Sequence, residues 1–258
     1  MIDRYPDISA IDVINLTKIY GRSLRSVLSR FPKTPAVNDA SLSVTQGEIV
    51  AVIGPTGAGK TTLVKSILGL VRPTSGTVYI GGWKNTSTGW KPLAGYLPEG
   101  FRSNPMATPL SILRLMGRLR NMTARECSRR TLDLLSLLEL HEVKHEHCKK
   151  LSRGMLLRVG IAQALIHRPR IVVLDEPTAG LDPIGKRIIR DVLRSLKDDG
   201  VAVVITSHLL TEVEEMADRI AMMASGRLTV LPETGASLRE SNRTLEEVFS
   251  EHLKEAHA

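Results

Sequence analysis

The stretch that decides the fold spans residues 49–70 and reads IVAVIGPTGAGKTTLVKSILGL. Its first five residues, Ile49–Ile53, form a continuous apolar run of the length of a buried parallel strand. Gly54–Thr61 follows and fits the pattern G-x-x-x-x-G-K-[ST]. Lys60–Leu70 then has the pattern of a helix. A buried strand, a glycine-rich loop and a helix in this order predict a loop that holds phosphate groups.

The residue types in this loop suit a triphosphate, which is a dense anion. Glycines let backbone N–H groups approach it closely and permit positive φ angles, and the start of the helix adds the positive end of its dipole. We expect Lys60 to reach the β- and γ-phosphates and the Thr61 hydroxyl to ligate Mg²⁺. The alternative, a glycine turn that merely joins strand to helix, is disfavoured because the lysine and threonine are in register. The residues expected to contact ATP here are Gly54, Pro55, Thr56, Gly57, Ala58, Gly59, Lys60, Thr61 and Thr62.

The composition is that of an ordinary globular chain and does not indicate which ligand the protein binds. Of the 258 residues, 42% are hydrophobic and 24% charged. Aromatic residues, at 3%, argue against a nucleic-acid binder built on base-stacking platforms. The net charge of +8 suits an anionic ligand, an anionic membrane surface or nucleic acid, although a solvated basic surface is the simplest explanation.

The cysteine content and the N-terminus indicate a cytoplasmic location. Cys127 and Cys148 do not make a disulfide framework and fit a reducing compartment. Met1–Ala10 has no apolar segment typical of a signal peptide. Because no apolar run approaches the roughly 20 residues of a membrane helix, we expect any membrane-spanning part to belong to another chain.

Strand-like and helix-like patterns alternate along the chain, which predicts an α/β fold with a mostly parallel sheet. Residues 83–92 have the composition of a loop, and the basic segment 22–35 has the spacing of a short amphipathic helix. Further strands are expected at 11–16, 37–44, 76–80, 93–97, 171–174, 201–205 and 219–223. Further helices are expected within 108–151 and at 153–167, 184–196, 209–217 and 244–256.

A second set of motifs narrows the choice among phosphate-binding proteins. Leu151–Met155 reads LSRGM, and the apolar run from Ile171 ends in Asp175-Glu176, followed by Ala179–Pro183 and then Thr206-Ser207-His208. In order and spacing these motifs resemble those of the nucleotide-binding domains of ABC transporters, from about residue 11 to residue 226. The resemblance implies a P-loop NTPase (RecA-like) core, an antiparallel β subdomain and a helical subdomain inserted at about 98–160. The ATPase domain would then span 1–226, and 227–258 would be a short extension that ends in a helix.

The resemblance also implies roles for these residues, and each has a simpler alternative. Asp175 would reach the Mg²⁺ shell and Glu176 would polarise the attacking water, whereas a strand-end turn with solvated acids is the alternative. His208 would contact the γ-phosphate, or it would merely cap the strand. Ser152 and Gly154 would face the nucleotide of a partner subunit, or Ser152 would be a plain helix cap. Asp182, in the family's D-loop, would also contact the nucleotide.

Three positions match or depart from the family's motifs in ways that bear on the nucleotide site. Tyr20 matches the aromatic residue that stacks on adenine in the family, and packing within its own subdomain is nearly as good an explanation. Glu99 stands where the family usually has glutamine; it could touch Mg²⁺ or water, but its charge alters the metal shell. Arg153 replaces the first glycine of the family's signature and adds bulk and charge near the γ-phosphate site, and we expect it to point outward.

Two other segments carry side chains that could bind a ligand. His141 and His145 are expected to share a helix face, which makes a metal site with His147 and Cys148 conceivable, but the glutamates and lysines between them favour a solvated surface. The basic segment 22–33 could meet anionic lipid or a membrane partner, although an ordinary loop insertion is the simpler explanation.

The function expected from the whole pattern is that of an ATP-hydrolysing subunit that uses ATP and Mg²⁺. It would dimerise head to tail on ATP and drive separate transmembrane subunits from the cytoplasmic face of the membrane. Residues 98–150 would carry the contact with those subunits, with Glu99 at the hinge, and the motifs are more like the export-type (ABC-2-like) branch. A soluble ABC-type ATPase that acts on nucleic acid or ribosomes is the alternative, but no nucleic acid is expected as a partner. A regulatory ATP-binding module without turnover is a further alternative.

Overall fold

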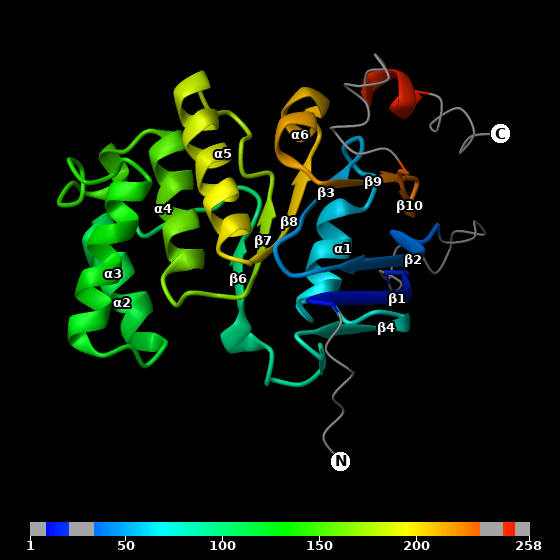
Figure 1. Ribbon diagram of the computed structural model, residues 1–258, viewed down its shortest axis with the longest axis horizontal. Coiled ribbons are helices and arrows are strands. Elements are labelled where there is room, and N and C mark those ends of the chain that lie inside the picture. The colour runs from blue at the N-terminus through cyan, green and yellow to red at the C-terminus, as the bar shows by residue number, and fades with distance from the viewer. Residues whose placement is uncertain (1–8, 21–33, 233–244, 251–258) are drawn as a thin grey trace, which may run out of the picture. The chain divides into compact units, whose positions relative to one another are not determined.

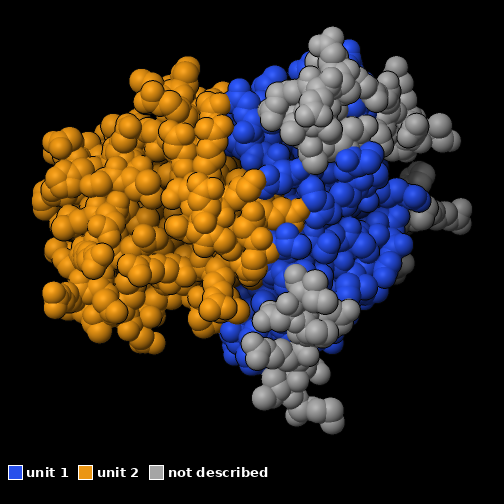
Figure 2. Space-filling model, in the orientation of Figure 1, with its two compact units in different colours: residues 1–45, 50–90, 208–258 blue, residues 46–49, 91–207 orange. Residues whose placement is uncertain are grey.

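The computed structural model describes residues 9–20, 34–232 and 245–250. It divides into two compact units, shown in blue and orange in Figure 2. Unit 1 contains residues 1–45, 50–90 and 208–258, and unit 2 contains residues 46–49 and 91–207. Each unit is therefore built from segments that are separated in the sequence.

Unit 1 contains a four-stranded antiparallel sheet of order β2-β1-β4-β5 (Figure 1). Its strands are β1 (Ile11–Lys18), β2 (Val37–Val44), β4 (Ser75–Ile80) and β5 (Trp83–Lys84). Along β2 the buried side chains are Val37, Ala40, Leu42 and Val44. A strand with one face in the core buries alternate residues, and β2 does so at its second half. The expected antiparallel β subdomain is therefore present, with β5 as a strand that the sequence pattern had not predicted.

Unit 1 also contains the strand that precedes the glycine-rich loop, together with two strands from near the end of the chain. β3 (Ile49–Ile53) is buried at every residue and pairs in parallel with β9 (Arg219–Ala224). β10 (Arg227–Val230) returns antiparallel to β9. Helix α1 (Lys60–Ile67) follows the loop, and α6 (Leu210–Met216) precedes β9. A strand buried on both faces needs the unbroken apolar run that the sequence supplies at 49–53.

Unit 2 contains the parallel strands β6 (Ala94–Leu97), β7 (Ile171–Asp175) and β8 (Ala202–Ser207), with β7 between the other two. Helix α4 (Arg153–Leu165) approaches β6 closely, because a Cβ atom at Gly95 would lie 2.2 Å from the carbonyl oxygen of Ala164. Helix α5 (Pro183–Asp198) buries one apolar stripe, made of Ile188, Ile189, Val192, Leu193 and Leu196. These elements place Asp175 at the carboxyl end of a buried parallel strand, as predicted.

The helical part of unit 2 consists of α2 (Pro109–Leu119) and α3 (Ala124–Leu137), which lie side by side in Figure 1. Each helix begins with a capping box, formed by Thr108 with Ser111 and by Thr123 with Glu126. The two helices pack closely, since a Cβ atom at Gly117 would lie 2.5 Å from Cys127 Sγ. Short 3₁₀ turns precede β6 at Lys91–Leu93 and precede α4 at Cys148–Lys150.

The structure agrees with most of the predicted elements and adds to them. β5 and β10 were not predicted, and the helical pattern over 108–151 resolves into two helices that end at Leu137. Residues 245–250 are helical, within the helix expected at 244–256. The expected amphipathic helix at 22–35 falls almost entirely outside the described residues. Among the described helices, none combines the length and the apolar character that a membrane crossing requires.

His167, just after α4, gives unit 2 a pH dependence that can be measured. Its Nε2 atom lies 3.1 Å from the carbonyl oxygen of Ala94 and donates to it. Burial, and then the charge of Arg120, lower the pKa of His167 from 6.5 to about 4. In the unfolded chain the histidine binds its proton near pH 6.5, so the folded state loses stability as the pH falls from about 6.5 to about 4.

We therefore expect His167→Gln to lose less stability than wild type between pH 7 and pH 5, as measured by urea denaturation at both values. The difference between the two losses of stability reports on His167 alone, because the other titrating residues are the same in both proteins. An equal loss of stability in the two proteins would show that His167 is not the source.

Candidate functional site

The glycine-rich loop in unit 1 is shaped by three glycines that act in different ways. A Cβ atom at Gly54 would lie 2.2 Å from the carbonyl oxygen of Met223, so this glycine allows the loop to pass close to β9. Gly59 has a φ of +110°, and a Cβ there would lie 2.1 Å from the carbonyl oxygen of Ala36. Gly57 has a φ of +84°, but a Cβ there would meet no atom within 4 Å. The loop is thus packed on one side and open at Gly57, which is the arrangement that a phosphate-binding loop needs.

Lys60 and its neighbours stand where the loop becomes helix α1. The Lys60 ammonium group is largely buried and donates to the carbonyl oxygens of Gly54, at 2.7 Å, and Pro55, at 3.4 Å. The side chain therefore curls back over the loop that it follows. A buried cation beside a glycine-rich loop at the start of a helix fits an anionic ligand such as ATP.

Tyr20 lies beside this helix start. Its hydroxyl is 3.2 Å from Thr62 Oγ1, and the ammonium of Lys18 lies 5.2 Å from the centre of its ring. Tyr20 is 50% exposed, so part of the ring is open to a ligand. Stacking on adenine stays a prediction, but the structure brings Tyr20 together with the loop residues, as that prediction requires.

Asp175 and Glu176 in unit 2 are joined by a residue that the sequence had not singled out, Thr206 of β8. The Thr206 hydroxyl donates to Asp175 Oδ1 at 2.5 Å, and the backbone N–H of Glu176 donates to Thr206 Oγ1 at 3.0 Å. Asp175 is 1% exposed, and Glu176 has a φ of +56°, in the left-handed region that non-glycine residues rarely adopt. The strand end therefore fixes both acids in defined positions.

The oxygen donors at hand fit Mg²⁺, which prefers carboxylate, hydroxyl and phosphate oxygens. Asp175 supplies a buried carboxylate in unit 2, and Thr61 supplies a hydroxyl in unit 1. Their common participation in one metal site stays a prediction.

Glu99 lies near the same end of unit 2. Burial, and then the charges of Asp175 and Glu99, raise the pKa of Tyr96 to about 12. The buried phenol is therefore neutral at physiological pH. The charges of both acids thus act on Tyr96, and the role of Glu99 at a metal site stays a prediction.

The motif at Leu151–Met155 lies at the start of α4, where Ser152 is a helix cap, as its simpler alternative role predicted. Ser152 is the N-cap of α4, and its hydroxyl accepts from the backbone N–H of Met155 at 3.2 Å. A Cβ atom at Gly154 would lie 2.9 Å from Leu181 Cδ2, so the glycine lets Leu181 approach the helix start. Arg153 is exposed, as expected, and its guanidinium carbon lies 3.6 Å from where a Cβ at Gly180 would be. This bulk therefore lies over the turn at Gly180.

Asp182 caps α5 in the same way, since its Oδ1 accepts from the backbone N–H of Gly185 at 2.7 Å. Capping does not exclude a nucleotide role for Ser152 or Asp182, because both helix starts retain further N–H groups. Their contacts with a nucleotide stay predictions.

The predicted site residues are thus divided between the two units. Unit 1 holds the loop, Tyr20 and the exposed His208, and unit 2 holds the acids and the two capping residues. Thr206 is the functional candidate that sequence reasoning missed. The sequence does show a hydroxyl residue near the end of an apolar run. Only the parallel pairing of β7 with β8 shows that this residue lies opposite Asp175.

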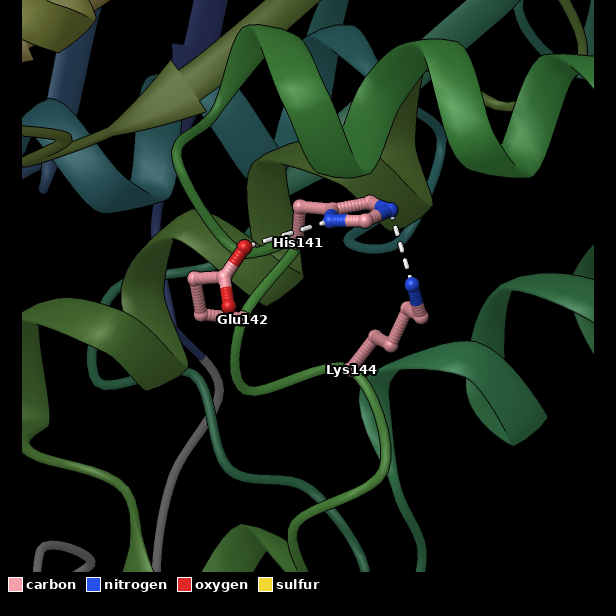
Figure 3. Close-up of polar contacts among 3 residues, drawn as sticks. All are labelled: His141, Glu142 and Lys144. Atoms are coloured by element: carbon pink, nitrogen blue, oxygen red, sulfur yellow. Dashed lines mark hydrogen bonds and ion pairs between the residues drawn. The ribbon is translucent and has the colours of Figure 1, made fainter.

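The histidines before the signature motif do not form the arrangement expected for them. His141 and His145 lie in a turn segment and not on a helix, so the expectation of a shared helix face was wrong. The helix ends earlier because α3 stops at Leu137. Both ring nitrogens of His141 are engaged, by Glu142 at 3.4 Å and by Lys144 at 2.7 Å (Figure 3). Over the described part of the chain, no group of three or more His, Cys, Asp or Glu residues could hold a metal ion.

Comparisons with known proteins identify the family. The family model for the ABC transporter domain matches residues 37–179. The chain is 35% identical over 233 residues to YxlF of Bacillus subtilis, an uncharacterized ABC transporter ATP-binding protein. The alignment covers 90% of this chain and 77% of YxlF. This chain belongs to the ABC transporter ATP-binding family. It is also 33% identical over 243 residues to SrtF of Streptococcus pyogenes, a lantibiotic transport ATP-binding protein, which covers 94% of this chain and 97% of SrtF.

A solved structure of the family supports the fold and the reaction. The chain resembles the ATP-binding cassette MJ0796 in a dimeric post-hydrolysis state bound to ADP and Pi, with a TM-score of 0.75 and 27% identity over 86% of this chain and 99% of that one. The P-loop NTPase fold and the ATPase activity expected of this ABC ATP-binding protein are therefore confirmed. The roles of its individual residues stay predictions.

Proposed function

We propose that this ABC ATP-binding protein holds Mg-ATP on the loop at residues 54–61 and pairs head to tail with a second cassette. The observation that carries this proposal is the backbone of the loop, which is open at Gly57 and has the buried Lys60 ammonium beside it. Tyr20 would stack on adenine, with Thr62 beside it. Ser152, Gly154 and Asp182 would meet the nucleotide held by the second copy, where their helix N-termini favour phosphate.

Hydrolysis would use the two acids at the end of β7. Glu176 orients a water molecule so that its oxygen attacks the γ-phosphorus, while the bond from that phosphorus to the β–γ bridging oxygen breaks. The products are ADP and inorganic phosphate. Asp175, Thr61 and Glu99 would hold Mg²⁺, which supplies positive charge against the phosphate oxygens when bound. His208 would help to keep water and Glu176 in line.

The mechanical partner is proposed to be a separate transmembrane subunit on whose cytoplasmic face the cassette sits. The helical part of unit 2 presents Leu115 and Leu119, four residues apart on one face of α2 and 53% and 66% exposed. These two side chains would supply apolar area to a contact with a partner protein. The likeness to SrtF, a lantibiotic transport ATP-binding protein, supports the export-type branch.

Affinity purification of the full-length chain from detergent-solubilised membranes of its native cells tests this partner. We expect a protein with several membrane-spanning helices to co-purify, and we expect Leu119→Glu to lose it because a charge would be buried in the contact. Leu70→Glu is the matched control, since Leu70 is 61% exposed in unit 1 and should keep the partner. Both variants should keep basal ATPase activity. Recovery of ribosomes or nucleic acid in place of a membrane protein would instead favour the soluble ABC-type ATPase.

A further inference from the structure

Thr206 is a fully buried side chain that contacts both of the proposed catalytic-site acids in unit 2. Its relative exposure is 0%. Its hydroxyl donates its one proton to Asp175 Oδ1 at 2.5 Å and accepts the backbone N–H of Glu176 at 3.0 Å. The hydroxyl therefore donates its only proton to the Asp175 carboxylate, and its oxygen accepts a hydrogen bond from the backbone of Glu176.

The bond to Asp175 constrains the carboxylate. A hydroxyl-to-carboxylate bond is charge-assisted, and at 2.5 Å this one is at the short end of the range. It engages Oδ1 and restricts the rotation of the carboxylate. Partners that orient a metal-binding carboxylate in this way tune the metal site almost as strongly as the ligands do.

The bond to Glu176 constrains the backbone. With a φ of +56°, Glu176 is in a conformation that is strained for a non-glycine residue and persists only where surrounding bonds enforce it. The Thr206 oxygen accepts the N–H of this residue and so holds the turn in place. The direction in which the Glu176 side chain leaves the strand end depends on that turn.

We propose that Thr206 is a positioning residue for ATP hydrolysis, which couples the orientation of Asp175 to the backbone conformation of Glu176. The inference rests on the roles proposed above for these two acids. In this proposal Thr206 acts through Asp175 and Glu176, with which its hydroxyl forms hydrogen bonds. A valine of the same shape keeps the packing of β8 but removes both hydrogen bonds, whereas a serine keeps both bonds and loses only a methyl group.

The test compares Thr206→Val and Thr206→Ser with wild type in the full-length protein. We expect Thr206→Val to lower kcat, or to raise the Mg²⁺ concentration at half-maximal activity, by about 10–100-fold. The KM for ATP should change by less than about 3-fold, because the nucleotide contacts of the loop are untouched. Thr206→Ser should recover both quantities to within about 3-fold of wild type.

A second readout needs no turnover and no nucleotide. Amide hydrogen exchange of Glu176 should become faster in Thr206→Val and stay slow in Thr206→Ser, because the N–H loses its acceptor only in the valine variant. Thr131→Val is the matched control for burying a valine in place of a threonine. Thr131 is also 0% exposed, and its Oγ1 has no hydrogen-bond partner among the described residues. This control should keep wild-type turnover and exchange.

The outcomes separate the inference from the function on which it rests. Thr206→Ala serves if Thr206→Val is not folded by thermal melting, since it removes the same two bonds with a smaller side chain. Wild-type kcat, Mg²⁺ dependence and Glu176 exchange in a folded Thr206→Val or Thr206→Ala variant would overturn the inference alone. Full turnover in both Asp175→Asn and Glu176→Gln would instead overturn the proposed site.

Discussion

The Glu176→Gln variant is expected to hydrolyse ATP about 10²–10⁴-fold more slowly than wild type, the range for loss of a residue that polarises the attacking group. Glutamine has nearly the same shape as glutamate, so the turn at φ +56° and the bond from its N–H to Thr206 should persist. The change removes the negative charge that orients and polarises the water. ATP affinity should stay close to wild type or increase, because repulsion between this carboxylate and the γ-phosphate is also removed.

Phosphate release under saturating Mg-ATP measures the turnover of Glu176→Gln, and a fluorescent ATP analogue measures binding. Glu142→Gln is the matched control, since the Glu142 side chain is 97% exposed and lies in the turn after α3. It should hydrolyse ATP as wild type does. Equal turnover in Glu176→Gln and wild type would refute the assignment of Glu176.

The Lys60→Ala variant is expected to lose ATP binding. The Lys60 ammonium is largely buried and donates to a carbonyl oxygen of the loop on which the phosphates are proposed to lie. Truncating one partner of a buried charge pair costs at least about 2–5 kcal/mol, which raises the Kd by roughly 30-fold to several thousand-fold. Turnover at any practical ATP concentration should fall with it.

Isothermal titration with ATP checks the binding of Lys60→Ala, and thermal melting checks that the variant is folded. Lys65→Ala is the matched control, because Lys65 lies in the last turn of the same helix and outside the loop. It should bind ATP as wild type does. A Kd for Lys60→Ala within about 3-fold of wild type would show that the loop does not use its lysine to hold phosphate.

The sequence could predict the strand, loop and helix at 49–70 because each depends on local residue types. A five-residue apolar run, glycines with positive φ and a helix-forming run need no information from distant parts of the chain. Asp175 at a strand end was predictable for the same reason, since 171–175 is an apolar run that ends in an acid.

Elements that depend on a distant partner were not predictable. β5 has only two residues, and β10 alternates exposed and half-exposed positions, so neither carries a hydrophobic pattern of its own. Both exist because a neighbouring strand offers an edge, β4 for the first and β9 for the second.

Helical structure within 108–151 was predicted, but the point at which it divides was not. Asn121 takes a positive φ, and Thr123 then starts a new helix with its own capping box. His141 and His145 have helical spacing, but the helix had already ended before them. The bond between Thr206 and Asp175 links residues 31 positions apart, and only the parallel pairing of β7 and β8 brings them together.

A crystal structure of Glu176→Gln grown with Mg-ATP tests the central claim most directly. Two chains should enclose two nucleotides, each with its phosphates against the backbone of residues 54–61 in one chain and against Ser152 of the other. A structure in which that loop carries no nucleotide, together with no ATP affinity in solution, would contradict the account.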